Sequence, residues 1–313
     1  MSAAALKAIE TKRPGAGRLI AARARWLGWG LLSPALVILL IMTVAPTIYL
    51  VYVSFRKENL LGPGSHFNGF DNFVNVLTNP DIWWDGAATL IFVTLSVTLE
   101  LALGLGLALL LNRRLRETNF LTALFITPLG IAPVVSALVF RVLFDPAFGW
   151  IDWYLQRWHI ISEPIDWFGS PVLAWFVVIL LDVWQWTPFV ALILLAGLSG
   201  IPGEPKEAAL VDGATPGQIF RHITLPFLRS FIAIALVLRA IEAFKTFGSI
   251  FVLTGGGPGI STEVINLSLY RIALQNFDVG AAAALGLIFL FFLSLIMSQL
   301  LRVLGRNTDI LED

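Results

Sequence analysis

The sequence has no cysteine, few histidines and no phosphate-binding loop. Without cysteine, a disulfide scaffold, a thiolate zinc site and a cysteine nucleophile are all excluded. The three histidines, His66, His159 and His222, are too far apart in the chain for an HExxH zinc site. No Gly-Lys dipeptide occurs, which excludes the GxxxxGK[ST] loop that cradles nucleotide phosphates. The chain therefore cannot hydrolyse ATP through a P-loop of its own.

Charge is also scarce and evenly balanced. Charged residues make up 13% of the 313 residues, whereas a soluble domain usually carries about 25%. Hydrophobic residues make up 57%, and the mean hydropathy is +0.82. Lys+Arg and Asp+Glu are equal at 21 each, so the positive excess typical of nucleic-acid binding is missing. This composition predicts a multi-pass membrane protein that does not bind nucleic acid.

Six apolar segments are long enough to cross a bilayer, which takes about 20 residues in a helix. None has the alternating pattern of a membrane β-barrel strand, and the 26 residues before the first segment argue against a cleaved signal peptide. We therefore predict an all-α membrane protein with six transmembrane helices. The predicted spans are residues 27–54, 87–111, 119–144, 171–197, 228–253 and 279–304. They form one domain over 27–304, between an N-terminal tail (1–26) and a C-terminal tail (305–313).

The basic residues are distributed unequally between the two sides of the predicted bundle. Fourteen of the 21 lie in the N-terminal tail, in the loops after the second and fourth spans, and at the C-terminal end. Four lie in the opposite loops and three lie within spans. Because cytoplasmic loops carry the excess of Lys and Arg, both termini are predicted to be cytoplasmic.

The loops of the opposite side are acidic and rich in tryptophan. Two interpretations are compatible: an interfacial aromatic belt, and a docking surface for an extracytoplasmic partner. The residues concerned are Asp71, Asp81, Trp83, Trp84 and Asp85 in the first loop, and Asp145, Trp150, Asp152, Trp153, Trp158, Asp166 and Trp167 in the second.

The sequence of the loop over residues 198–227 predicts two short helices. In the first helix, Pro205 and Glu207 suit the first turn, where a missing N–H costs nothing and an acidic side chain complements the helix dipole. Gly213 can end this helix in the left-handed conformation.

The second helix is predicted to begin at Thr215, which forms a capping box with Gln218, and to end at Pro226. Helices this short are marginal unless they pack on something. The pair is therefore either a docking element for another protein or a loop packed on the end of its own bundle.

The same loop resembles the EAA loop of bacterial ABC importer permeases. The family pattern is Glu-Ala-Ala, three residues, Gly, nine residues, Ile-x-Leu-Pro. This chain has Glu207-Ala208-Ala209, Gly213 and Ile223-Thr224-Leu225-Pro226, with both spacings kept. The runs Ile201-Pro202, Val211-Asp212-Gly213-Ala214 and Leu253-Thr254-Gly255-Gly256-Gly257-Pro258 resemble the carbohydrate-uptake branch. The resemblance covers about residues 27–304.

The resemblance implies a type I ABC importer permease fold with a cytoplasmic coupling helix, in the inner membrane of a bacterium or archaeon. It implies a second homologous permease as heterodimer partner, two ATPase subunits, an extracytoplasmic solute-binding protein and membrane lipids. ATP and Mg would bind the ATPase, with no cofactor and no catalytic residue in this chain. The residues that would couple to the ATPase are Glu207, Ala208, Ala209, Asp212, Gly213, Ile223, Leu225 and Pro226.

Six charged residues lie within the predicted spans, where they are costly and usually face the bundle interior. They are Glu100, Arg141, Asp182, Arg239, Glu242 and Lys245. The spacing i, i+3, i+6 of the last three allows neighbours to touch. They divide into three acids and three bases, so one interpretation is a structural ladder of ion pairs between helices, and the other is a translocation path.

A sugar path is favoured by the polar and aromatic residues of the fourth and fifth spans, because rings stack on the C–H faces of sugars while carboxylates and amides bind hydroxyls. The candidate residues are Asp182, Trp184, Gln185, Trp186, Glu242, Lys245 and Phe247, with Phe244 as a further stacking surface. Pro188 can kink the fourth span. The Gly255–Gly257 run is interpreted as a turn rather than a phosphate site.

Two other functions remain as alternatives. An ion-gradient-driven secondary transporter would use the intramembrane carboxylates, although no inverted repeat is visible. A membrane-embedded enzyme would need a catalytic constellation for which the chain has few histidines and no cysteine.

Overall fold

The computed structural model describes residues 16–62, 64–112 and 123–306, and these are predominantly helical. The predicted all-α class is confirmed. Residues 1–15 and 307–313 of the two predicted tails, and 119–122 of the third predicted span, lie outside the described residues. So do Arg113, Arg114 and Arg116, which contribute to the predicted orientation.

The N-terminal unit, which ends at Val53, consists of one long helix in its described part. This helix, α2 (Ala16–Ser54), begins 11 residues before the predicted span and contains Pro34 and Pro46. Its apolar part, Trp29–Ser54, is long enough to cross a bilayer and is almost entirely exposed within the chain. Exposed side chains of this kind suit contact with lipid.

The second unit begins at Ser54 and holds the remaining elements. It opens with a two-stranded antiparallel sheet, β1 (Arg56–Lys57) and β2 (His66–Phe67), in which Arg56 pairs with Phe67. The helices up to the loop are α3 (Asp71–Thr78), α4 (Pro80–Leu111), η1 (Thr127–Gly130), α6 (Pro133–Leu143), α7 (Trp150–Arg157) and α8 (Pro171–Ser199). They are followed by α9 (Gly203–Val211), α10 (Pro216–Ile219), η2 (Phe220–Thr224), α11 (Leu225–Phe244), α12 (Gly248–Leu253), α13 (Ile265–Tyr270), η3 (Arg271–Gln275) and α14 (Val279–Arg306).

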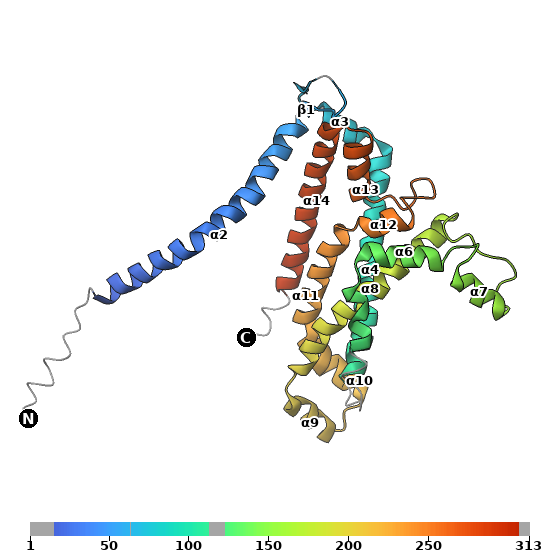
Figure 1. The fold of residues 1–313 in the computed structure, drawn as a ribbon. Coiled ribbons are helices and arrows are strands. Elements are labelled where there is room, and N and C mark those ends of the chain that lie inside the picture. The colour runs from blue at the N-terminus through green and yellow to red at the C-terminus, as the bar shows by residue number, and fades with distance from the viewer. Residues whose placement is uncertain (1–15, 63, 113–122, 307–313) are drawn as a thin grey trace, which may run out of the picture. The chain divides into compact units, whose positions relative to one another are not determined.

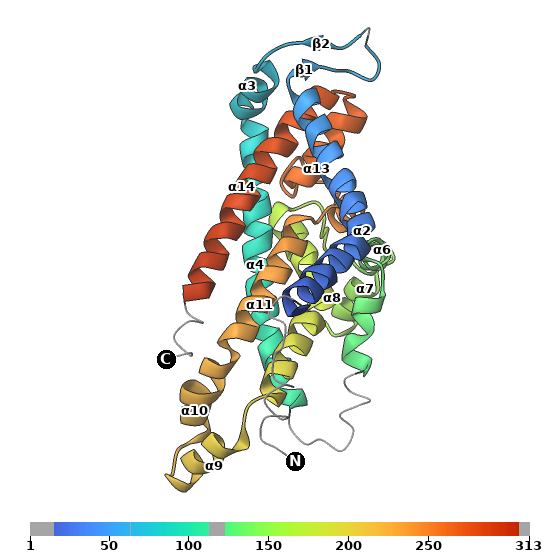
Figure 2. The same cartoon turned by 90° about the vertical axis from the view of Figure 1, so that its left-hand side faces the viewer.

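Helices α4, α8 and α11 pack against one another and form the core of this unit. Two glycines mark their closest approaches. A Cβ at Gly104 of α4 would lie 2.7 Å from Val190 of α8, and a Cβ at Gly197 of α8 would lie 2.6 Å from Phe231 of α11. Small residues at helix crossings are the usual means by which membrane helices pack closely. Both views place α9 and α10 at one end of this bundle, and α3 and α13 toward the other (Figure 1, Figure 2).

The third predicted span is not one straight helix. Residues Ala123–Gly130 and α6 are bent by 101° at a short break. Pro128 and Pro133 each remove a backbone N–H donor, and Ala132 is extended as expected for a residue before proline. The expectation of a continuous segment over 119–144 is therefore wrong at residues 131–132.

The fifth predicted span also divides. Its helix α11 ends at Phe244 instead of continuing to residue 253, and α12 is a separate helix. The amide of Asn266 donates to the carbonyl oxygens of Phe244 and Thr246, at 2.8 and 3.0 Å. This side chain satisfies carbonyl groups that a helix C-terminus leaves unpaired, so the break is stabilised from outside the segment.

Candidate functional site

The first helix of the loop after α8 ends in a complete Schellman motif. Gly213 has φ of +78°, in the left-handed region expected for a glycine cap. Its N–H donates to Leu210 O at 3.1 Å, and Ala214 N–H donates to Ala209 O at 2.9 Å. The helix begins at Gly203, two residues before Pro205. The predicted glycine cap is present, and it fixes the direction in which the chain leaves α9.

The second helix of the loop begins at the predicted capping box. Thr215 N–H donates to Gln218 Oε1 at 2.7 Å, and Gln218 N–H donates to Thr215 Oγ1 at 3.4 Å. Two donors at the helix N-terminus are thereby satisfied. Because the Schellman motif ends at Ala214 and the capping box begins at Thr215, the turn between α9 and α10 has little freedom.

The expectation that Pro226 ends the second helix is wrong. Residues Pro216–Phe244 run as one helix through α10, η2 and α11. The segment η2 is a π-helix, with Leu225 N–H bonded back to Phe220 O. Proline in a regular helix clashes with the carbonyl of residue i−4, and the wider π turn before Pro226 relieves this clash. The loop is therefore continuous with the helix that follows.

Helix α9 has no buried residue, and its apolar residues Leu210 and Val211 are 61% and 88% exposed. Beside it lies a hollow of about 420 Å³ lined by Ala209, Asp212, Gly213, Ala214, Gln218, Ile219, His222 and Ile223. Of the predicted coupling residues, Ala209, Asp212, Gly213 and Ile223 line this hollow, Glu207 and Ala208 are exposed on α9, and Leu225 and Pro226 begin α11. Within α9, Pro205, Lys206 and Ala209 are half-buried and the other residues are exposed.

A buried triad of charges joins the three core helices. Arg239 of α11 contacts Glu100 of α4, with Nε at 2.5 Å from Oε2 and Nη2 at 2.9 Å from Oε1, and it also binds Asp182 of α8. Arg239 and Glu100 are 1% and 0% exposed, and Asp182 is 8% exposed. The guanidinium lies 5.1 Å from the ring centroid of Trp186. Arg239 therefore pairs across helices instead of along α11.

The other intramembrane charges have separate surroundings. Lys245 Nζ lies 2.6 Å from Glu242 Oε1, three residues earlier, and both side chains are largely exposed. Arg141 donates to the carbonyl oxygen of Leu253 and lies 5.3 Å from the ring centroid of Phe168. Along α11 itself only Glu242 and Lys245 pair, whereas Arg239 pairs between helices, as the interpretation of structural ion pairs between helices expects.

Most of the predicted path residues surround one cavity of about 320 Å³, here called the α8–α11 pocket. Its lining is Pro133, Leu181, Asp182, Gln185, Trp186, Arg239, Glu242, Lys245, Thr246, Phe247, Gly248 and Ser249. Trp184 lies outside this cavity because it is about 200° around the helix from Asp182, and its ring is tilted against that of Phe140, with centroids 5.5 Å apart. Phe244 is buried in the core beside Phe289. The cavity thus brings together Asp182, Gln185, Trp186, Glu242, Lys245 and Phe247.

The glycine-rich turn after α12 is tied to three helices. Arg271 donates to Gly255 O and pairs with Glu263, both at 2.5 Å. The indole N–H groups of Trp84 and Trp175 donate to the carbonyls of Ile260 and Ser261, at 2.9 and 3.0 Å. Burial raises the pKa of the Glu263 carboxyl, and Arg271 opposes this by favouring its charged form.

The backbone N–H groups of this turn are already bonded within it. Gly255 N–H donates to Ile250 O, Gly256 N–H to Thr254 Oγ1 and Gly257 N–H to Thr254 O, at 3.0, 3.1 and 3.1 Å. A phosphate cradle needs such donors free, so this geometry agrees with the interpretation as a turn.

We expect Gly256→Ala to lower the melting temperature of the purified protein more than Gly259→Ala does. Both residues have positive φ, +89° and +61°, so backbone strain of about 1–3 kcal/mol is common to the two variants. Only at Gly256 would the added Cβ meet neighbours, with Leu267 at 3.0 Å and Arg271 at 3.1 Å. Thermal unfolding in detergent measures the difference, and equal melting temperatures would contradict it.

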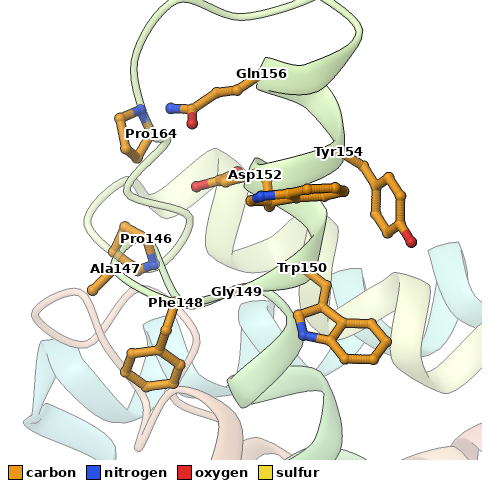
Figure 3. A pocket seen from close by; sticks show the side chains of 10 residues that line it. Pro146, Ala147, Phe148, Gly149, Trp150, Asp152, Tyr154, Gln156 and Pro164 are labelled. Atoms are coloured by element: carbon orange, nitrogen blue, oxygen red, sulfur yellow. The ribbon is translucent and has the colours of Figure 1, made fainter.

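The second aromatic loop contains one more hollow, of about 440 Å³, beside α7 (Figure 3). Asp152 is buried there and accepts hydrogen bonds from Trp167 Nε1 and Ile165 N–H, at 2.8 and 3.0 Å. Trp150 and Trp158 are instead 68% and 67% exposed. The tryptophans of this loop therefore divide between core and surface.

A comparison with known families identifies the chain. Residues 100–310 match the family described as "Binding-protein-dependent transport system inner membrane component". The matched region begins at Glu100 and includes the whole triad, the α8–α11 pocket and the loop with α9. The chain belongs to this family. It is an inner-membrane permease of the ABC transporter type.

Relatives of the permease align over most of its length. It is 35% identical over 260 residues to the trehalose/maltose transport system permease protein MalF of Thermococcus litoralis, covering 83% of this chain and 88% of the relative. It is 33% identical over 294 residues to the diacetylchitobiose uptake system permease protein DasB of Streptomyces coelicolor, and the alignment covers 90% of this chain and 89% of the relative. A crystal structure of a bacterial ABC transporter involved in the import of the acidic polysaccharide alginate contains a similar chain, with a TM-score of 0.79 and 25% sequence identity. The match covers 92% of this chain and 99% of that chain.

Several pocket residues of the permease were not assigned to the path from sequence. Arg239 was recognised only as an intramembrane charge, while Thr246 and Ser249, whose hydroxyls are 3.2 Å apart, were not singled out. The run Lys245-Thr246-Phe247-Gly248-Ser249 interrupts an apolar segment. That polar run was the available signal, because it marks the end of α11.

Proposed function

We propose that this permease imports a carbohydrate, a sugar or a related polyol or oligosaccharide, by alternating access driven by a separate ATPase. Helix α9 carries the proposal: it is capped at its C-terminus, has no buried residue and displays the Glu-Ala-Ala sequence. Apolar side chains as exposed as Leu210 and Val211 favour a protein surface that covers them. A groove on an ATPase subunit would provide that surface, and Glu207 would face a positive group in it.

The same proposal includes the other partners and the orientation. Two ATPase subunits would bind ATP and Mg, which this chain has no P-loop to hold. A second homologous permease would complete a heterodimer, and an extracytoplasmic solute-binding protein would deliver the substrate. The distribution of basic residues supports cytoplasmic termini and a cytoplasmic α9.

The substrate class is supported by the relatives and by the pocket. The two sequence relatives are named for trehalose/maltose and for diacetylchitobiose. The α8–α11 pocket offers the aromatic rings of Trp186 and Phe247 beside the amide of Gln185. Rings suit the apolar faces of sugars, and amides and carboxylates suit their hydroxyls.

Reconstitution separates this function from ion-driven transport. The permease would be purified with its partner permease and ATPase, placed in liposomes with the cognate binding protein, and supplied with labelled trehalose or maltose as probes. We expect uptake that requires ATP and the binding protein and that persists when ion gradients are collapsed. Uptake that runs on an ion gradient without the ATPase would overturn the proposal.

A further inference from the structure

Both basic side chains at the α8–α11 pocket are already paired with acids. Arg239 binds Glu100 and Asp182 at once, and Lys245 lies 2.6 Å from Glu242. Arg141, the other base of the spans, does not line the pocket and bonds to a carbonyl oxygen elsewhere. Among the residues that the structure describes around this pocket, no cation is left without an acidic partner.

The pocket lining holds two acids, Asp182 and Glu242, and two bases, Arg239 and Lys245, while a third acid, Glu100, binds Arg239 without lining the pocket. An anion placed beside Lys245 would also lie close to Glu242, so attraction and repulsion largely cancel beyond the first contact. Arg239 is 1% exposed, and its guanidinium is occupied by two carboxylates. Moving an anion out of water without a dedicated cation is costly.

The uncharged groups of the pocket remain suited to hydroxyls and sugar rings. Gln185 donates through Nε2 to Ile131 O at 2.7 Å, which leaves its carbonyl oxygen as an acceptor. Thr246 and Ser249 contribute hydroxyl groups, and Trp186 and Phe247 contribute rings. A neutral polyhydroxylated molecule can use all of these groups without a net charge.

We infer that the α8–α11 pocket selects uncharged carbohydrates and disfavours anionic ones. The inference rests on the proposed function, and it deepens that function by naming the charge of the substrate. Transporters with this fold differ in the charge of their substrates, because the structurally similar transporter is involved in the import of an acidic polysaccharide.

Matched pairs of sugars test the inference directly. The probes are trehalose, maltose and diacetylchitobiose, each beside an analogue in which one C6 hydroxymethyl group is oxidised to a carboxylate. Binding to the intact permease–ATPase complex in nanodiscs, without the binding protein, would be measured by calorimetry. We expect each neutral sugar that binds to do so at least tenfold more tightly than its uronate.

Two variants of the exposed pair serve as opposite controls. Glu242→Gln leaves Lys245 as an unpaired cation and should reduce the preference for the neutral sugar about tenfold. Lys245→Gln leaves Glu242 alone and should preserve or increase that preference. Equal affinity for both members of a pair in the wild type, or an unchanged preference in Glu242→Gln, would overturn the inference. If neither the neutral sugars nor the uronates bind, the α8–α11 pocket is not a carbohydrate site, and the inference is overturned as well.

Discussion

Replacing Arg239 with methionine is expected to destabilise the permease strongly, by about 3–5 kcal/mol, because two carboxylates would remain buried without a counter-charge. The three partners come from α4, α8 and α11 and are almost completely buried, so water cannot replace the guanidinium. Thermal unfolding of the purified protein in detergent measures the loss as a fall in melting temperature.

Two further variants show whether the loss of stability in Arg239→Met comes from charge or from packing. Lys245→Met also removes a base from the end of α11, but it breaks an exposed pair, and such pairs contribute about 0–1 kcal/mol. The triple variant Glu100→Gln, Asp182→Asn, Arg239→Met removes the whole triad and should recover most of the lost stability. The explanation would be wrong if Arg239→Met were as stable as the wild type, or if the triple variant were no more stable than Arg239→Met.

Changing α9 at Glu207 or Gly213 is expected to lower uptake at least tenfold while membrane insertion and basal ATPase activity persist. Glu207→Arg reverses the charge on the exposed face of the helix. Gly213→Asp puts a side chain where φ is +78° and adds a negative charge beside the helix C-terminus, where the dipole disfavours it. Both changes alter the proposed ATPase contact rather than the bundle, since α9 has no buried residue.

Gly217→Asp is the matched control for the second of these variants. It makes the same substitution in the same loop, at a position with open space and without a positive φ. Gly217 lies in the first turn of the helix that Thr215 caps, where an acidic residue is favourable. Uptake and ATP hydrolysis are measured together in liposomes that contain the complex. Normal uptake in both Glu207→Arg and Gly213→Asp would exclude the coupling role of α9.

Local features of the loop could be predicted because they depend on near neighbours in the chain. The glycine cap of α9 and the capping box at Thr215 each involve groups within five residues of one another. Hydropathy located the apolar segments for the same reason, since it sums over adjacent residues. It could not locate breaks inside them, and the prolines at 128 and 133 were the better signal for the bend.

The pairing of the buried charges depends on distant parts of the chain. Arg239 binds carboxylates 139 and 57 residues away. The balance of three acids and three bases indicates pairing between helices, but spacing in the sequence identifies a partner only along the same helix, at Glu242. Helix geometry alone could have separated Trp184 from Asp182, Gln185 and Trp186, since only the latter three share one face. Hydropathy carries the predicted fifth span past the end of α11, because the contact that stabilises this end comes from Asn266 on α13; within the segment only the polar run from Lys245 to Ser249 marks the end.

The unbroken helix from Pro216 to Phe244 has a mechanical consequence. It contains 29 residues, and at about 1.5 Å per residue it spans about 40 Å. One end forms a wall of the hollow beside α9, and the other carries Arg239 and Glu242 at the α8–α11 pocket. If α9 docks on an ATPase as proposed, a helix of this length would act as a lever arm. A tilt imposed at Thr215 would pass through the π turn and Pro226 to Arg239, where it would act on the salt bridges to α4 and α8.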